Sequence, residues 1–122
     1  MANPNIVGVT TINGNTTTVS ATTSFKTLVN NKASSGKIMK INTLLATNAN
    51  GGNAVTVTVV LYPEDDLGGT SQTIAHTISV PEDSTLIVID KNSSLYLLED
   101  KTLAANAGAS GVVFTTSFDE IS

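Results

Sequence analysis

Few side chains in this sequence have the chemistry of a catalytic or metal-binding group. His76 is the one histidine, and the chain has no cysteine. A general base needs an orienting partner and a nucleophile, and a metal site needs further ligands. His76 has no obvious companion of either kind. We therefore interpret it as a partly buried histidine that is hydrogen-bonded to a neighbour, or as a contact at a subunit interface, and we predict no catalytic residue.

The acidic residues come in short runs where turns are expected. The run Glu64-Asp65-Asp66 offers carboxylate oxygens of the kind that calcium prefers, but it lacks the alternating oxygen spacing of calcium loops. Gly68 and Gly69 follow it and indicate a turn. The pair Glu99-Asp100 is interpreted in the same way, as solvated charge near a strand end. The sequence thus predicts no metal site and no cofactor.

The elements that would position these groups are predicted to be β-strands, because the dominant hydrophobic period is two. The clearest example runs from Ala54 to Tyr62, where an apolar face alternates with a mixed face. The apolar face consists of Val55, Val57, Val59 and Leu61.

Four more segments support an all-β chain. Gln72 to Val80 is predicted to place Ile74, His76, Ile78 and Val80 on one apolar face. Val112 to Phe118 has its first valine and both phenylalanines on one face. Leu86 to Ile89 is a continuous apolar run, which predicts a strand covered on both sides. Lys101 to Ala109 is interpreted as a strand that leads into a loop of small residues.

Turn residues fall between the expected strands. Asn13-Gly14 separates Val9–Ile12 from Thr16–Val19, which predicts a two-residue hairpin. Asn50-Gly51-Gly52 separates the expected strand Ile38–Asn48 from the one that starts at Ala54, which predicts a second hairpin with a longer loop.

Short strands at this spacing predict an all-β fold: a single antiparallel β-sandwich, Greek-key or jelly-roll-like, of about 7–9 short strands. Residues 1–122 form one domain in this prediction, with residues 1–10 as a candidate N-terminal arm. The stretch from Ala2 to Thr10 fits such an arm and an ordinary first strand equally well.

Composition excludes several classes of partner. Of the 122 residues 13% are charged, the six basic residues are all lysines, and the net charge is -4. Without a basic stripe or arginine, nucleic-acid binding is not expected. No apolar stretch approaches the roughly 20 residues that cross a membrane, so no membrane partner is expected. No secretory signal is visible at the N-terminus, and we expect the protein to be made and kept in a cytoplasm.

Several blocks of the sequence, taken together, resemble small virion structural proteins of marine tailed bacteriophages. The blocks are Met1–Val7, Ala33–Asn42, Ile74–Pro81, Leu86–Lys91, Leu95–Leu97 and Ser117–Ser122. They are strand and turn patterns and not catalytic motifs. The chain departs from the expected pattern at His76 and Phe118, where tyrosine is expected, but both substitutions keep a large ring.

The resemblance implies a capsid decoration or cement protein that is not an enzyme. It implies a homotrimer on the outside of the virion, assembled in the host bacterial cytoplasm, with the major capsid protein as partner. Such a protein stabilises the assembled shell because it binds only that state. The N-terminal residues are the candidate contacts with the capsid or with a neighbouring copy: Asn3, Pro4, Asn5, Ile6 and Val7.

An alternative from another class is a tail, fibre or surface module that recognises a host glycan or receptor. Glycan sites use exposed aromatic rings as stacking platforms, and Tyr62 and Tyr96 are the candidates. Only 4% of the residues are aromatic, so few rings are available for stacking against a sugar. An enzyme is the third class, and it would need a base, a nucleophile and a cleft that the sequence does not supply.

Overall fold

A computed structural model describes residues 7–122 of the chain. This part contains nine strands and one short 3-10 helix, η1 (Lys91–Ser93). None of its helical segments is long and apolar enough to cross a membrane. The strands are β1 (Ile12–Ser20), β2 (Lys26–Asn31), β3 (Ile38–Asn48), β4 (Val55–Tyr62), β5 (Gln72–Val80), β6 (Ser84–Ile89), β7 (Leu95–Leu97), β8 (Lys101–Ala107) and β9 (Val112–Ile121).

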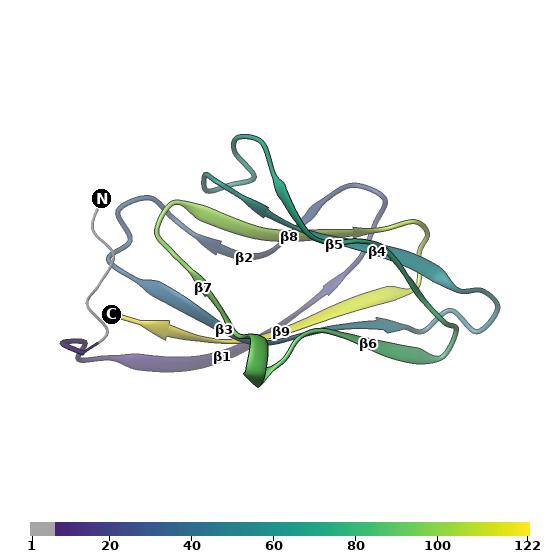
Figure 1. Cartoon of the computed structure of the whole chain (residues 1–122), viewed down its shortest axis with the longest axis horizontal. Helices are drawn as coiled ribbons and strands as arrows, with labels where there is room; N and C mark the ends of the chain where they lie inside the picture. Colours follow the sequence, from purple (N-terminus) through teal and green to yellow (C-terminus); the bar gives the residue numbers. More distant parts are fainter. Residues whose placement is uncertain (1–6) are drawn as a thin grey trace.

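The strands form two sheets that lie face to face (Figure 1). The large sheet has the order β1-β9-β3-β6, with β7 also paired to β3, and the small sheet has the order β2-β8-β4-β5. All the pairs are antiparallel. Successive strands cross between the sheets except at β4–β5 and β6–β7. With β7 set aside, this is the connectivity of an eight-stranded jelly roll, and the predicted antiparallel β-sandwich is confirmed.

The core lies between the two sheets and comes from alternate residues of each strand. In β4, Val55, Val57 and Val59 are buried, as their spacing predicts. In β9, Phe114 and Phe118 are buried on one face, which confirms the prediction for that segment. A fully buried side chain of this size contributes about 1.5–3 kcal/mol through the hydrophobic effect. These apolar faces hold the two sheets together.

Two buried asparagines connect the sheets at opposite ends of the strands. Asn31 of β2 donates from its side-chain amide to the carbonyl of Leu97 in β7, at 3.1 Å. Asn48 of β3 donates to the carbonyl of Val80 in β5, at 3.0 Å. Both asparagines are 0% exposed. Because a buried amide is costly unless it is hydrogen-bonded, these pairs fix where the two sheets meet.

The predicted hairpin at Asn13-Gly14 is wrong. These residues lie inside β1, where Gly14 pairs with Asp119 of β9. A hairpin would require residues 9–12 to pair with residues 16–19, whereas β1 pairs along its whole length with the C-terminal strand. The described residues of the N-terminal stretch, 7–10, precede β1 and form no strand, so the first-strand interpretation is wrong for them.

The turn predicted at Asn50-Gly51-Gly52 is present, but the hairpin around it is wrong. The turn connects β3 of the large sheet to β4 of the small sheet. Each of these strands already has a partner on both sides, so the connection passes from one layer to the other. The amide of Asn48 holds the start of this turn by a bond to the carbonyl of Asn53, at 2.9 Å.

The predicted single apolar face of β5 is also wrong. The pairing between β4 and β5 shifts register twice, and Thr77 has a φ of 44° at one of these bulges. Each bulge inserts an extra residue and reverses the alternation. As a result Ala75 packs against the core, whereas Ile74 is 42% exposed. Ile78 lies opposite Val57 but is 41% exposed on this edge strand.

The apolar run at residues 86–89 was predicted to be covered on both sides, and this is wrong as well. The run lies in β6, an edge strand of the large sheet, and Ile87 is 61% exposed. Leu86 and Val88 pack partly against the core. In contrast, the prediction of a strand that starts at Lys101 and leads into a loop of small residues is confirmed by β8.

Candidate functional site

The described part of the chain offers surfaces and not an enclosed site. Residues 7–122 form no pocket. Within the same range, no three side chains among histidine, cysteine, aspartate and glutamate lie close enough to hold a metal ion. We therefore take each candidate residue in turn and ask what surface it belongs to.

His76 is exposed, and the interpretation of a partly buried histidine is wrong. It lies in the bulged part of β5, next to Thr77. The backbone N–H of Thr77 donates to the hydroxyl of Thr58 in β4, at 3.0 Å, and this bond fixes the bulge. His76 itself is exposed on an edge strand, and it belongs to no group of three potential metal ligands among the described residues.

The acidic loop between β4 and β5 uses its carboxylates to fix the backbone. Asp65 accepts a hydrogen bond from the backbone N–H of Ala33, at 2.9 Å. Asp66 accepts from the side-chain amide of Asn30, at 2.7 Å, and forms an ion pair with Lys32, at 3.0 Å. These contacts tie the loop to β2 and to the turn that follows it. The run is a structural anchor, since the carboxylates of Asp65 and Asp66 already have donors.

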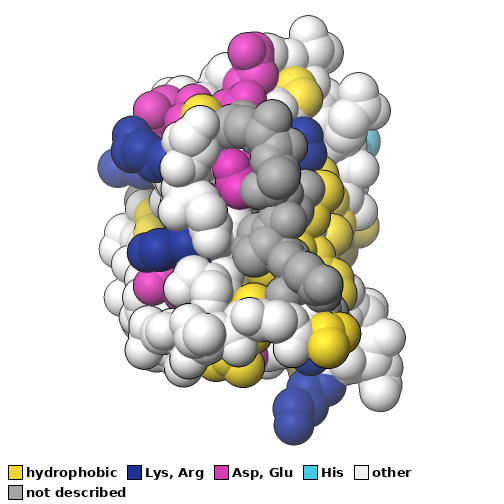
Figure 2. Space-filling model, turned by 90° about the vertical axis from the view of Figure 1, so that its left-hand side faces the viewer, with side chains coloured by type: hydrophobic (Ala, Val, Ile, Leu, Met, Phe, Trp, Pro, Cys, Tyr) yellow, Lys and Arg dark blue, Asp and Glu magenta, His cyan; other side chains and the backbone are white. Residues whose placement is uncertain are grey.

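The pair Glu99-Asp100 is not simply solvated charge. Asp100 accepts a hydrogen bond from the backbone N–H of Asp65, at 3.0 Å, and so helps to fix the acidic loop between β4 and β5. Glu99 is only 8% exposed. Both belong to the turn between β7 and β8, at the end of the molecule where acidic side chains gather (Figure 2).

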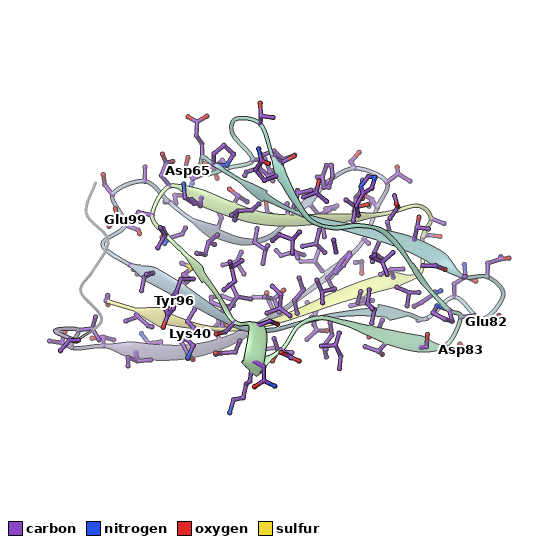
Figure 3. The ribbon with its side chains drawn as sticks, in the orientation of Figure 1. Lys40, Asp65, Glu82, Asp83, Tyr96 and Glu99 are labelled. Carbon is purple, nitrogen blue, oxygen red and sulfur yellow. The ribbon has the colours of Figure 1, made fainter. Side chains whose placement is uncertain are left out.

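The two candidate tyrosines lie on different sheets. Tyr62 ends β4 in the small sheet and is half-buried, with its ring edge-on to Phe25 at a centroid distance of 6.3 Å. Tyr96 lies in β7 of the large sheet, is 42% exposed and pairs with Lys40 of β3. Figure 3 shows Tyr96 and Lys40 side by side. The structure therefore does not bring the tyrosines together into one stacking platform.

Four of the five candidate N-terminal contacts, Asn3 to Ile6, lie outside the described residues. Val7 is described and is 91% exposed in a turn. Just after it, the backbone N–H groups of Thr10 and Thr11 both donate to the carbonyl of Ser122, at 3.0 Å. These bonds hold the segment just before β1 to the C-terminal residue of the chain.

The outer face of the large sheet is the surface that sequence reasoning missed. We call it the open face, and it consists of eleven side chains that point away from the core in β1, β9, β3 and β6. They are Thr16, Thr18, Ser20, Thr43, Leu45, Thr47, Thr85, Ile87, Val113, Thr115 and Ser117. The register decides their direction, because directly opposite residues of an antiparallel pair share a face.

The open face carries no charge and is not covered by the described residues. Eight of its eleven side chains are Thr or Ser and the others are aliphatic, and none of them is buried. The open face ends, on one side, at the opposite pair Lys40 and Asp119. Short side chains on a sheet give a broad, shallow surface with hydroxyl groups among methyl groups. Such a surface suits contact with another protein surface better than capture of a small molecule.

A signal for this face exists in the sequence, but only in part. Alternate hydroxyl residues recur in Thr16-x-Thr18, Thr43-x-Leu45-x-Thr47 and Thr115-x-Ser117. Each pattern by itself is what strands ordinarily show. The patterns join because β1 and β9 lie side by side, and Thr16 meets Ser117 across 101 positions of sequence.

Comparison with known proteins adds no identification: no family model matches the chain, and neither curated proteins nor solved structures give a match.

Proposed function

We propose that this protein is a non-enzymatic structural protein of a bacteriophage virion, a capsid decoration or cement protein that binds the assembled shell. The observation that carries the proposal is the open face: a broad, uncharged surface of eleven short side chains on a jelly-roll sandwich. Jelly rolls are common in viral capsid domains, which supports the proposal by analogy of fold.

The chemistry of the open face suits a large protein partner. A non-obligate protein interface is about as apolar as ordinary protein surface, and its centre is depleted of charge. Methyl and hydroxyl groups meet both requirements. The cost of desolvation stays low, because no charged side chain has to be buried. The major capsid protein is the proposed partner, and the open face is the proposed centre of the contact.

Stabilisation of the shell would follow from mass action. A protein that binds only the assembled shell lowers the free energy of that state by RT ln(1 + [L]/Kd). Repetition of a weak contact over linked copies multiplies its effect. The residues from Asn3 to Val7 are proposed as a second contact, with the capsid or with a neighbouring copy. The homotrimer that the resemblance implies stays a prediction.

The first experiment is to count copies of this protein per purified virion, by quantitative mass spectrometry against the major capsid protein. Hundreds of copies in a ratio set by shell symmetry are expected. A dozen copies would contradict decoration and place the protein in the tail or collar. No copies at all would exclude a virion protein.

The second experiment tests the open face itself. Thr115→Lys places a charge at the middle of the open face, where burial on binding would leave it unpaired. We expect its binding to purified shells to fall by at least about tenfold, which is about 1.4 kcal/mol. Thr73→Lys is the matched control, since Thr73 is an exposed threonine of β5 in the small sheet. Equal loss in both variants, or in neither, would contradict a contact through the open face.

A second candidate function is recognition of a host glycan, and one observation favours it. Tyr96 is exposed beside Lys40, so a ring and a cation occupy neighbouring positions at the edge of the large sheet. Jelly rolls also occur in lectins. Tyr96→Ala would then abolish binding to a glycan array, whereas the decoration proposal expects no array binding from the parent protein.

A further inference from the structure

Among residues 7–122 the sandwich has five edge strands, and three of them are interrupted. The edges of the large sheet are β1 on one side and β6 with the three-residue β7 on the other, and the edges of the small sheet are β2 and β5. The pairing of β5 shifts register twice, and the pairings of β2 and β6 shift once each. Bulges, short length and charge are the usual means by which an edge strand avoids pairing with another chain. β2 and β6 are also short, at 6 residues each, and β2 begins with Lys26.

β1 has none of these protections. It is 9 residues long, contains no charged residue and no proline, and pairs with β9 without a register shift. Seven of its nine residues are exposed and the other two are half-buried. A long, regular and exposed edge of this kind is a template for strand addition.

The hydrogen bonds at the two ends of β1 show which of its backbone N–H and C=O groups point away from β9. Thr11 exchanges two hydrogen bonds with Ser122, at 3.0 and 2.9 Å, and the N–H of Ala21 donates to the carbonyl of Val112, at 2.8 Å. In an antiparallel pair every second residue faces the partner strand in this way. The odd-numbered residues of β1 therefore bond to β9, and the even-numbered residues point their N–H and C=O groups outward. Within residues 7–122 no strand pairs with that outer side.

We propose that β1 pairs antiparallel with β1 of a second copy of this chain, about a two-fold axis at Thr16. This register puts Thr16 opposite Thr16 of the other copy, Gly14 opposite Thr18, and Ile12 opposite Ser20. All of these have outward-facing backbone groups, so the pairing forms about ten hydrogen bonds. The contact closes after two copies, because a two-fold contact uses the same patch on both.

Charge favours a second copy as the occupant. The chain has a net charge of -4, so most contacts between copies bring like charges together. β1 carries none, and the nearest acidic side chains on β9, Asp119 and Glu120, are at least three strand spacings, about 14 Å, from their counterparts in the other copy. That distance exceeds the screening length of about 8–10 Å in physiological salt.

A buried hydroxyl on β1 supports this register. The hydroxyl of Thr17 is the one buried side-chain polar atom without a hydrogen-bond partner among the described residues. In the proposed register Thr17 lies opposite Asn15 of the second copy, in the closely spaced type of pair. The pairing therefore brings an amide next to the position that lacks a partner. It also joins the two open faces into one continuous uncharged surface.

This inference goes beyond the proposed function and does not depend on it, and it proposes a dimer in place of the homotrimer that the resemblance implies. The test is sedimentation of the whole chain over a range of concentrations. Strand pairing alone buries less than a standard interface, so we expect a monomer–dimer equilibrium with a Kd roughly in the micromolar range. Thr16→Lys and Thr16→Glu each place like charges directly opposite one another, and each should raise the Kd at least about tenfold. An equimolar mixture of the two should restore dimers.

The controls separate the edge from the rest of the face. Thr43→Lys and Thr43→Glu change the same face on β3, two strands from the edge, and should leave the dimer unchanged alone and in mixture. Thr16→Pro removes an N–H group that the folded monomer does not use, and should abolish the dimer while the chain still folds. A parent protein that sediments as a monomer or a trimer, or a Lys and Glu mixture that stays monomeric, would overturn the proposal. Copy number in the virion is a separate readout and fails independently.

Discussion

The outer faces of the two sheets differ in how far the rest of the chain covers them. On the small sheet, Val60 and Ala104 point away from the core, yet they are only 2% and 0% exposed. The adjoining part of that face carries the β4–β5 loop, which Figure 1 shows above the small sheet. On the large sheet none of the eleven side chains of the open face is buried. Within residues 7–122, the chain covers part of one face with its own residues and leaves the other uncovered.

The difference shows which surface is structural and which is available. The loop over the small sheet is fixed by hydrogen bonds that Asn30, Ala33 and Thr102 donate to it and by one that Asp100 accepts from it. Changes there should reduce the free energy of unfolding. Changes on the open face should alter association with other molecules and leave folding nearly untouched, because its side chains make few contacts that folding needs.

The largest effect is expected from Gly69→Ala in the loop. Gly69 has a φ of 80°, and an added Cβ would lie 2.7 Å from the Cγ of Pro63. The left-handed backbone costs an ordinary residue about 1–2 kcal/mol, and overpacking adds about 1–3 kcal/mol. We expect a loss of about 3 kcal/mol in the free energy of unfolding, measured by urea denaturation.

Gly36→Ala is the matched control, because Gly36 has a φ of 71° but open space around its Cα. It should lose only the backbone part, about 1 kcal/mol. If the two variants were equally stable, the loop would not be packed tightly against Pro63, and the contrast between the faces would weaken.

The next effect is expected from Thr102→Val beneath the same loop. Thr102 is 0% exposed, and its hydroxyl accepts from the N–H of Leu67, at 3.2 Å, and lies 3.1 Å from the carbonyl oxygen of Glu64. Valine keeps the shape but leaves these groups buried without partners, which costs about 1–3 kcal/mol. The midpoint of urea unfolding should fall accordingly. An unchanged midpoint would mean that water reaches these groups and takes over the hydrogen bonds of the hydroxyl, so that the loop does not exclude solvent.

The sequence predicts the parts of this fold that depend on local alternation. The β4 pattern holds because the side chains of the central strand, Val55, Val57 and Val59, all face the core. The pattern fails in β5, because two bulges that depend on the pairing with β4 reverse the direction of its side chains. It fails at Ile87 because a strand with apolar residues on both faces looks the same in sequence whether it is central or at an edge.

The open face and the edge of β1 are consequences of long-range pairing. Asn13-Gly14 has the sequence of a turn, and only the pairing with β9 shows that it continues a strand. Once β1 is known to run from Ile12 to Ser20, its hydroxyl residues join those of β9 and β3. Sequence reasoning gave the β-sandwich, but it placed the candidate contacts at Asn3 to Val7 and at two tyrosines that lie on different sheets.

The smallest effect is expected from Thr115→Val, at the middle of the open face, which repeats the threonine-to-valine change made at Thr102. Thr115 is half-buried, and its hydroxyl makes no hydrogen bond among residues 7–122. Valine also suits a strand, so the free energy of unfolding should change by less than about 0.5 kcal/mol. A loss above about 1 kcal/mol would show that the hydroxyls of the open face hold the sheet together. The two faces would then differ in composition but both would stabilise the fold. That result would argue against the open face as a binding surface for another molecule.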